Sequence, residues 1–279
     1  MPLCVKANAK INLNLRIVGK RPDGYHLLKT VMQSVDLCDS LSFEKAESGI
    51  TLNCDNALLQ NSENLVHTAA KAFFKAAKIQ GGVKISLKKN IPVKSGLGGG
   101  SADAAATLLA LNKLYKKPLN TVEIKNLAAT LGADVPFFID GGTVLCEGIG
   151  EKTTPLPYVG DYYCLLVICG EKSSTKSMYE QVDKQIEEHN NTQISTDKLL
   201  CQNAYNSFLD ALDYKETVLD VISSLNNFGA IATGLSGSGP TVYALFKNET
   251  DLIAANGFLS LEFETRVCKT STKSVIIDE

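Results

Sequence analysis

The chain has 279 residues, of which 44% are hydrophobic and 21% are charged, and its formal net charge is −2 at pH 7. This composition is typical of a folded protein with a substantial apolar core, and the length allows one large domain or two of medium size. A net charge so close to zero provides no basic surface for duplex nucleic acid, so we expect no nucleic-acid partner.

Cysteine spacing and hydropathy exclude further classes of protein. No two of the eight cysteines form a C-x-x-C pair, which argues against a structural zinc site and favours reduced thiols. No apolar run approaches the roughly 18 residues that cross a bilayer. The first residues, MPLCVKANAK, lack the charged and then apolar pattern of a secretion signal. We therefore expect a cytoplasmic protein without a membrane partner, either a monomer or a homodimer.

The first predicted element is a strand over residues 4–17, where apolar and polar residues alternate strictly. Lys10 and Asn12 share its polar face, so their side chains emerge together. A lysine on such a face is usually solvated, and the pattern alone assigns it no function. The sequence GKRPDGYH then predicts a loop that contains Tyr25 and His26. A tyrosine ring there is available to stack on a ligand, or it packs against the protein.

Strands and helices alternate through the rest of the chain. LLKTVMQSVDL and SLSFEKA read as two strands, NLVHTAAKAFFKAAKI as an amphipathic helix, and VKISLKKNI as a strand. A helix over 122–131 ends at a glycine, which is a usual C-terminal cap. The proline-bearing stretch TTPLPYVGDYY is the best candidate boundary, which predicts domains over residues 1–155 and 156–279. The second domain contains a buried type of strand, YYCLLVIC, and helical stretches around 179–190 and 199–226.

Between these elements, the stretch NIPVKSGLGGGSADAAATLLALNKLY places four glycines just ahead of a helix. Glycines allow positive φ angles and leave no side chains in the way of a ligand. The run from Ser101 has apolar residues at a helical period, so a helix begins there. The N–H groups and the positive dipole end of such a helix favour an anion, above all phosphate. A flexible turn is the alternative, but a plain linker rarely leads straight into a strong helix.

A second glycine-rich segment runs from Gly234 to Gly239 between two strand-like segments. By itself it fits a tight hairpin turn as well as a binding loop. Neither glycine segment has the Gly-Lys-Ser/Thr of a P-loop or the G-x-G-x-x-G spacing of a dinucleotide site. The predicted phosphate site is therefore of another kind.

Two acids stand at predicted helix starts. Asp134 lies between TLGA and VPFF, and on its own it is expected to cap the next helical turn. Asp103 follows the first glycine segment and is also expected to be a cap. Beside a bound phosphate, its carboxylate would need a cation or an outward rotamer.

Taken together, ANAKINLNL, RPDGYHLLKTVMQSVDLCD, IPVKSGLGGGSADAAATL, LGADVPFF and GLSGSGPTVYALF resemble the galactokinase–homoserine kinase–mevalonate kinase–phosphomevalonate kinase superfamily. The motifs occur in the superfamily's order between residues 7 and 246. The resemblance implies a two-domain α+β fold: an N-terminal ribosomal-S5-like α/β domain and a C-terminal α+β sandwich domain, with the active site in the cleft between them. AKINLNL and RPDGYH narrow it to the members that act on a cytidine-diphosphate-linked methylerythritol in the non-mevalonate isoprenoid route.

The resemblance implies an ATP-dependent small-molecule kinase that phosphorylates the 2-hydroxyl of this substrate, with ATP and Mg²⁺ required. Asp134 would take the proton from the attacking hydroxyl, and Lys10 would keep Asp134 charged and stabilise the developing oxyanion. No residue is identified as a metal ligand. The ATP phosphates would contact a continuous run of residues: Pro92, Val93, Lys94, Ser95, Gly96, Leu97, Gly98, Gly99, Gly100, Ser101 and Ala102.

For the substrate, the resemblance implies that Asn12 shares the polyol pocket and that His26 hydrogen-bonds the cytosine edge, with Tyr25 stacked on the ring. Thr175 and Tyr179 match a threonine and an aromatic residue that complete this pocket. The second glycine segment would close over the substrate diphosphate, through Gly234, Ser236, Gly237, Ser238 and Gly239.

The sequence departs from the superfamily pattern at a few positions. Lys94 and Ser95 stand where small residues are common, and Lys94 either contacts phosphate or points to solvent. Two other functions stay open: a sister kinase acting on homoserine or a mevalonate derivative, and a catalytically inactive nucleotide-binding regulator. RPDGYH argues against the first, and the retention of Lys10 and Asp134 argues against the second.

Overall fold

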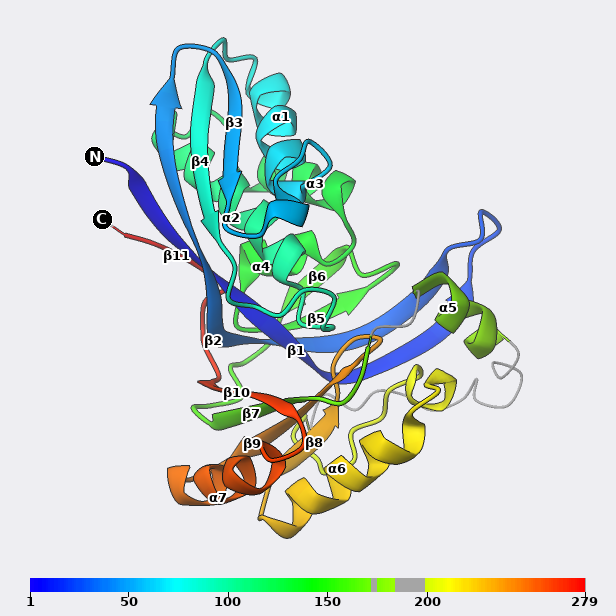
Figure 1. The fold of residues 1–279 in the computed structure, drawn as a ribbon. Coiled ribbons are helices and arrows are strands. Elements are labelled where there is room, and N and C mark those ends of the chain that lie inside the picture. Colours follow the sequence, from blue (N-terminus) through cyan, green and yellow to red (C-terminus); the bar gives the residue numbers. More distant parts are fainter. Residues whose placement is uncertain (172–174, 184–198, 279) are drawn as a thin grey trace.

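The computed structural model describes residues 1–171, 175–183 and 199–278 (Figure 1). Its helices and strands are, in chain order, β1 (Leu3–Lys20), β2 (His26–Ala46), β3 (Gly49–Cys54), α1 (Leu65–Ala77), β4 (Gly82–Lys88), α2 (Gly99–Leu114), α3 (Thr121–Leu131), α4 (Val135–Asp140), β5 (Thr143–Glu147), β6 (Lys152–Pro155), β7 (Tyr163–Ile168), α5 (Thr175–Asp183), α6 (Lys215–Asn227), β8 (Ala232–Leu235), β9 (Thr241–Phe246), α7 (Glu249–Leu259), β10 (Glu264–Lys269) and β11 (Val275–Ile277). No helix in this described part of the chain has the length and apolar character needed to cross a membrane.

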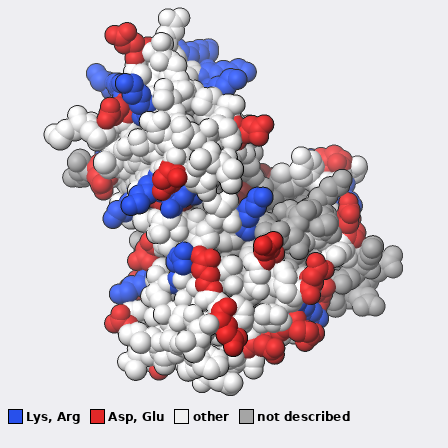
Figure 2. Space-filling model, in the orientation of Figure 1, with Lys and Arg blue, Asp and Glu red and all other residues white. Residues whose placement is uncertain are grey.

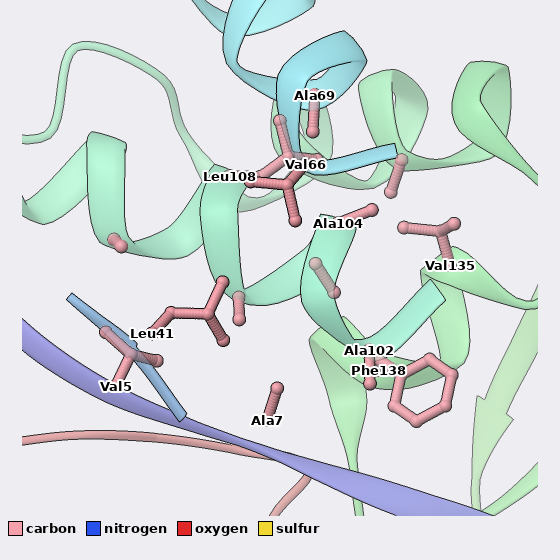
Figure 3. Packing of buried hydrophobic residues seen from close by; sticks show 14 of the residues in the cluster. Val5, Ala7, Leu41, Val66, Ala69, Ala102, Ala104, Leu108, Val135 and Phe138 are labelled. Atoms are coloured by element: carbon pink, nitrogen blue, oxygen red, sulfur yellow. The ribbon is translucent and has the colours of Figure 1, made fainter. Parts of the chain in front are cut away.

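The first sheet has the strand order β11-β1-β2-β4-β3, and β5 pairs with both β2 and β6. Helices α1 to α4 cover one of its faces (Figure 1). The alanine-rich helix α2 lies between β1 and helices α1 and α4, where small side chains such as Ala102 and Ala104 allow close packing (Figure 3). This core fixes the start of α2, and with it the first glycine segment.

The second sheet is antiparallel, with the order β10-β7-β9-β8. Helices α6 and α7 pack on it and close a second hydrophobic core (Figure 1). The proposed boundary between residues 155 and 156 separates β6 from β7, which belong to different sheets. Strand β11 departs from that division, because the chain returns to the first sheet, where Ile277 pairs with Val5.

Strands β1 and β2 form a long antiparallel ribbon that reaches from the first sheet to α5 (Figure 1). The two strands predicted after the Tyr25 loop are one continuous strand, β2. The polar face of β1 is not solvated: Asn8, Lys10 and Asn12 are each at most 2% exposed. The two glycine segments cover Lys10 and Asn12, and the side chain of Asn8 donates to the Lys273 carbonyl, so these polar side chains are satisfied by the protein instead of by water.

Two other expectations are wrong in detail. The stretch 199–226 is helical only over α6 and a short 3-10 helix, Leu209–Ala211. Residues before them hydrogen-bond to strands instead: Ala204 N–H donates to the Thr233 carbonyl, and Leu15 N–H to the Tyr205 carbonyl. Of the helix expected around 179–190, the described part is α5, and the remainder lies outside the described residues. Asp103 is not a cap either, since Gly98 occupies the N-cap position of α2.

Candidate active site

A cleft of about 610 Å³ lies where the two glycine segments meet the β1–β2 ribbon. Residues from β1 and β2, from α1, α2 and α5, and from the turn between β8 and β9 line it. On the face shown in Figure 2, basic and acidic side chains occur on both the upper and the lower part of the molecule. Predicted site residues on its lining are Lys10, Asn12, Pro92, Val93, Lys94, Ser95, Gly96, Gly98, Gly99, Gly100, Ser101, Asp134, Tyr179, Gly237 and Ser238.

The first glycine segment needs glycine at two positions in particular. Gly98 has φ of 73°, and a Cβ there would lie 2.7 Å from the Phe138 ring. Gly96 has φ of 81°, and its Cβ would lie 2.3 Å from the carbonyl oxygen of Ser236. The first turn of α2 follows directly, with its N–H groups at the cleft. Such a helix start is suited to phosphate.

The second glycine segment is the turn between β8 and β9, and it is tied to both neighbours. The Ser236 hydroxyl donates to the Gly96 carbonyl at 3.1 Å, and the Gly237 N–H donates to Asn12 Oδ1 at 2.8 Å. Asn12 also donates to the Thr30 hydroxyl at 2.8 Å. Asn12 thus connects the β1–β2 ribbon to the second glycine segment.

The predicted catalytic pair comes together in the cleft. Lys10 is 2% exposed; its Nζ donates to Asn12 Oδ1, and its backbone N–H donates to the Leu97 carbonyl at 3.0 Å. Asp134 is the N-cap of α4, but its side chain makes no capping hydrogen bond, so the carboxylate lines the cleft. Both charges act on the buried Cys146 thiol: its pKa is raised mainly by burial and further by Asp134, and Lys10 opposes the rise. The two side chains therefore face one region.

The predicted cytosine pocket has a different arrangement from the expected one. His26 is the first residue of β2 and 9% exposed, not part of the loop, and Tyr25 is 59% exposed. The ring that stacks on His26 is Tyr179, with centroids 4.3 Å apart. His26 Nε2 lies 2.5 Å from Asp183 Oδ1, and Lys20 donates to the other carboxylate oxygen. Hydrogen bonds from Lys20 and His26 lower the pKa of Asp183.

Sequence reasoning missed Asp183, although a signal existed. It follows Tyr179 by four residues on α5, which places both on one helical face. Neither Tyr25 nor His26 lines the cleft, whereas Tyr179 does. The side chain of Thr175 lies outside the described residues.

Several predicted contact residues lie behind the cleft surface. Leu97 and Ala102 are fully buried in the hydrophobic cores, and Gly234 lies within β8 against Ala204 and Tyr243. None of these three is on the cleft lining, because their positions face the interior of the sheets and helices.

Two further predicted residues help to hold the second segment. Ser236 is fully buried, and its hydroxyl donates a hydrogen bond to the Gly96 carbonyl. A Cβ on Gly239 would lie 3.1 Å from the Tyr214 hydroxyl. Both residues therefore pack on the side of the turn that faces away from the cleft and help to fix its conformation.

The cleft also contains groups to which sequence reasoning gave no site role. Lys89 Nζ donates to Asp39 and to Asp103, the latter at 2.7 Å. Asp103 is 2% exposed, and its second oxygen has no partner among the described residues. Burial, opposed by Lys89 and assisted by Asp39, raises the pKa of Asp103 to about 7. At the same end, the start of α1 adds Leu59, Glu63, Asn64 and Leu65 to the lining.

Comparison with known proteins identifies the family. The model described as GHMP kinases N terminal domain matches residues 64–142, and the one described as GHMP kinases C terminal matches residues 186–263. A 4-diphosphocytidyl-2-C-methyl-D-erythritol kinase from Clostridium beijerinckii is 43% identical over 256 residues, covering 87% of this chain and 90% of its own. A protein of the same name from Clostridium tetani is 40% identical over 252 residues, covering 87% and 90%. The chain belongs to the 4-diphosphocytidyl-2-C-methyl-D-erythritol kinase family of GHMP kinases.

Solved structures agree with this assignment. A crystal structure of 4-(cytidine 5'-diphospho)-2C-methyl-D-erythritol kinase matches with a TM-score of 0.81 at 30% identity, covering 95% of this chain and 98% of that one. Homoserine kinase from Cytophaga hutchinsonii matches with a TM-score of 0.74 at 18% identity, covering 99% and 97%, and shows the shared fold alone. The predicted two-domain α+β GHMP kinase fold is confirmed, and the chain is an ATP-dependent small-molecule kinase.

Proposed function

We propose that this kinase transfers the γ-phosphoryl group of ATP to the 2-hydroxyl of 4-diphosphocytidyl-2-C-methyl-D-erythritol. The products would be the 2-phosphate and ADP, in non-mevalonate isoprenoid precursor biosynthesis. One observation carries the proposal: Lys10 and Asp134 line the same cleft as the glycine segment at the start of α2, in a chain whose relatives have this name.

The first glycine segment would receive the phosphates of ATP. Gly96 and Gly98 leave space that a Cβ would fill, and the first N–H groups of α2 are aimed at the cleft. These features fit a phosphate chain. The lining from Leu59 to Leu65 lies beside this segment and is available to the rest of the nucleotide.

In the acceptor half of the cleft, Asp134 would accept the proton of the attacking hydroxyl. Lys10 would hold the hydroxyl oxygen and compensate the charge that develops on it. Phosphoryl transfer depends mostly on alignment and charge stabilisation, so fixed positions matter. Lys10 is fixed by Asn12, and Asp134 by its place before Pro136 at the start of α4.

Mg²⁺ bound to ATP supplies positive charge to the phosphoryl group in flight. Among the described residues there is no group of three or more His, Cys, Asp or Glu side chains suited to a metal. Mg²⁺ typically keeps several waters and takes one or two carboxylates besides phosphate oxygens. The lining of the cleft has carboxylates that could supply one or two ligands to a metal held mainly by the nucleotide.

The cytidine end of the substrate would lie toward Tyr179, His26 and Asp183. Tyr179 offers an aromatic wall at the cleft, and Asp183 fixes the orientation of the His26 ring. His26 would read the cytosine edge with the ring nitrogen that Asp183 does not occupy. Tyr25, at the exposed tip of the ribbon, would close on the base from the open side.

An ADP-release assay tests the proposal, with ATP, Mg²⁺ and the cytidylyl substrate beside mevalonate, phosphomevalonate and homoserine. We expect release with the cytidylyl substrate alone. Asp134→Asn should lower kcat by at least about 100-fold, because a positioned base contributes about 10²–10⁴. The control is Asp220→Asn, an exposed acid on α6. Release with another acceptor would make the chain a sister kinase, and ATP binding without turnover would favour a regulator.

A further inference from the structure

We propose that Lys89 binds a phosphate of the nucleotide and that Asp103 limits the strength of this binding by competing for the same ammonium. The inference rests on the proposed function, since it takes ATP as the ligand of the cleft. It adds two residues beneath the first glycine segment to the site.

Strand pairing places Lys89 at the start of α2. Ser40 of β2 pairs with Lys88 of β4, so the residues just beyond this pair, Asp39 and Lys89, lie together. The Lys89 side chain is 10% exposed, and a Cβ on Gly99 would lie 3.3 Å from its Nζ. The ammonium is therefore against the first residue of the helix, where a phosphate would contact the backbone N–H groups.

The hydrogen-bond donors of Lys89 are not all directed at Asp39 and Asp103. An ammonium has three N–H donors, and these two carboxylates take one each. Lys89 and Asp103 both line the cleft. One donor is left for an oxygen that arrives from the cleft.

The two carboxylates differ in how well they are satisfied. Asp39 is fully buried and also accepts from the N–H groups of Asn90 and Ile91, at 2.6 and 2.8 Å. Asp103 has Lys89 for one oxygen and no partner for the other among the described residues. A buried unpaired oxygen costs free energy, and here it lies beside the cleft. Asp103 is thus the less well satisfied of the two carboxylates that share Lys89.

The charge of this cluster is unfavourable for an anion. One ammonium faces two carboxylates, so the fully ionised cluster of Lys89, Asp39 and Asp103 is negative. Burial lowers the pKa of Lys89, but Asp103 and Asp39 outweigh this effect and raise it, so the lysine stays charged. Removing the charge of Asp103 should therefore strengthen the attraction of Lys89 for phosphate, whereas removing Lys89 should abolish that attraction.

Calorimetric titration with ADP, with and without Mg²⁺, tests the inference on the full chain. Lys89→Met should weaken ADP binding by roughly 10- to 100-fold, as expected for a lost charged hydrogen bond, and Lys89→Arg should retain most of it. Asp103→Asn should tighten binding by about three- to tenfold at pH 8, where most of Asp103 is ionised in the wild type. The matched control is Lys88→Met, a neighbouring lysine that is exposed and off the cleft, and should bind as the wild type does.

The outcomes separate this inference from its rivals. If Lys89 only neutralises Asp39 and Asp103, adding Lys89→Met to a folded Asp39→Asn/Asp103→Asn variant will leave ADP binding unchanged, which overturns the inference. If Lys89→Met does not fold, Asp103→Asn decides, and unchanged or weaker binding of metal-free ADP overturns it. Loss of affinity for MgADP alone in Asp103→Asn would make Asp103 a metal ligand, which also overturns it. Turnover of the cytidylyl substrate by the wild type is measured in a separate assay. If that substrate is not phosphorylated, the ADP titrations still test the roles of Lys89 and Asp103.

Discussion

The ring of Tyr179 lies parallel to the ring of His26, with centroids 4.3 Å apart and an interplanar angle of 12°. Tyr179 also meets Phe208 edge to face, at 5.1 Å. The stacking of Tyr179 on His26 joins α5 to the start of β2, two segments far apart in the sequence. Burial raises the pKa of Tyr179 to about 12, so its hydroxyl is neutral at physiological pH.

Tyr179→Leu is therefore expected to weaken binding of the cytidylyl substrate while sparing ATP. Loss of an aromatic face costs about 0.5–1.5 kcal/mol beyond buried area, so the KM for this substrate should rise by about two- to tenfold. Steady-state kinetics with each substrate varied in turn will show this, and Tyr179→Phe, which keeps the ring, is the control. An equal rise of both KM values would place Tyr179 in a purely structural role.

The local parts of the site could be predicted from the sequence. Alternation in β1 placed Lys10 and Asn12 on one face, and glycines before an apolar helical run located the start of α2. Each of these patterns spans only a few neighbouring residues, so it can be recognised in the sequence alone. The burial of the polar face of β1 could not be predicted in this way, because it depends on a turn more than 200 residues later.

Contacts between distant elements explain the remaining misses. Lys89 reaches Asp39 only because β2 and β4 pair in one register, and the sequence of neither strand alone predicts that register. His26 meets Asp183 across 157 residues. Helical period over 199–214 was overridden by strand-type hydrogen bonds, as tertiary context often overrides local preference.

Asn12 is expected to act as a positioning residue. Asn12→Ala removes the acceptor for Lys10 and for the Gly237 N–H, so Lys10 should lose its fixed position. We expect kcat to fall by about 10- to 100-fold, as misplacement of reacting groups does. Hydrogen exchange should also show faster exchange at the Gly237 amide. Thr30→Val, which removes the Thr30 partner of Asn12 and the donor to the Asn14 carbonyl but keeps Asn12, should have the smaller effect. Unchanged exchange at Gly237 in Asn12→Ala would contradict this role.

Gly96→Ala tests the close approach of the two glycine segments. Its Cβ would stand 2.3 Å from the Ser236 carbonyl oxygen, at a φ of 81° that alanine rarely adopts. The free energy of unfolding should fall by roughly 2 kcal/mol or more. Gly100→Ala is the matched comparison, because its Cβ would meet only Leu65 at 3.6 Å, and its stability should stay within about 0.5 kcal/mol. Urea unfolding monitored by circular dichroism gives both values; equal losses would contradict the contact.

Asp103 should make stability depend on pH. The fold raises its pKa from 3.8 to about 7, mainly through burial, so between these values the folded protein holds a proton that the unfolded chain has released. This contribution to the free energy of unfolding is complete below about pH 4 and is lost as pH rises through 7. It amounts to at most about 4 kcal/mol.

Asp103→Asn cannot titrate, so its stability relative to the wild type should increase steadily from pH 4 to pH 7.5. Urea unfolding of both proteins at unit intervals of pH measures that difference, with Asp220→Asn on the surface of α6 as the control. Parallel profiles for wild type and Asp103→Asn would mean that Lys89 keeps Asp103 ionised throughout. In that case the cluster carries its negative charge permanently, and the repulsion of phosphate by Asp103 would not weaken at acid pH.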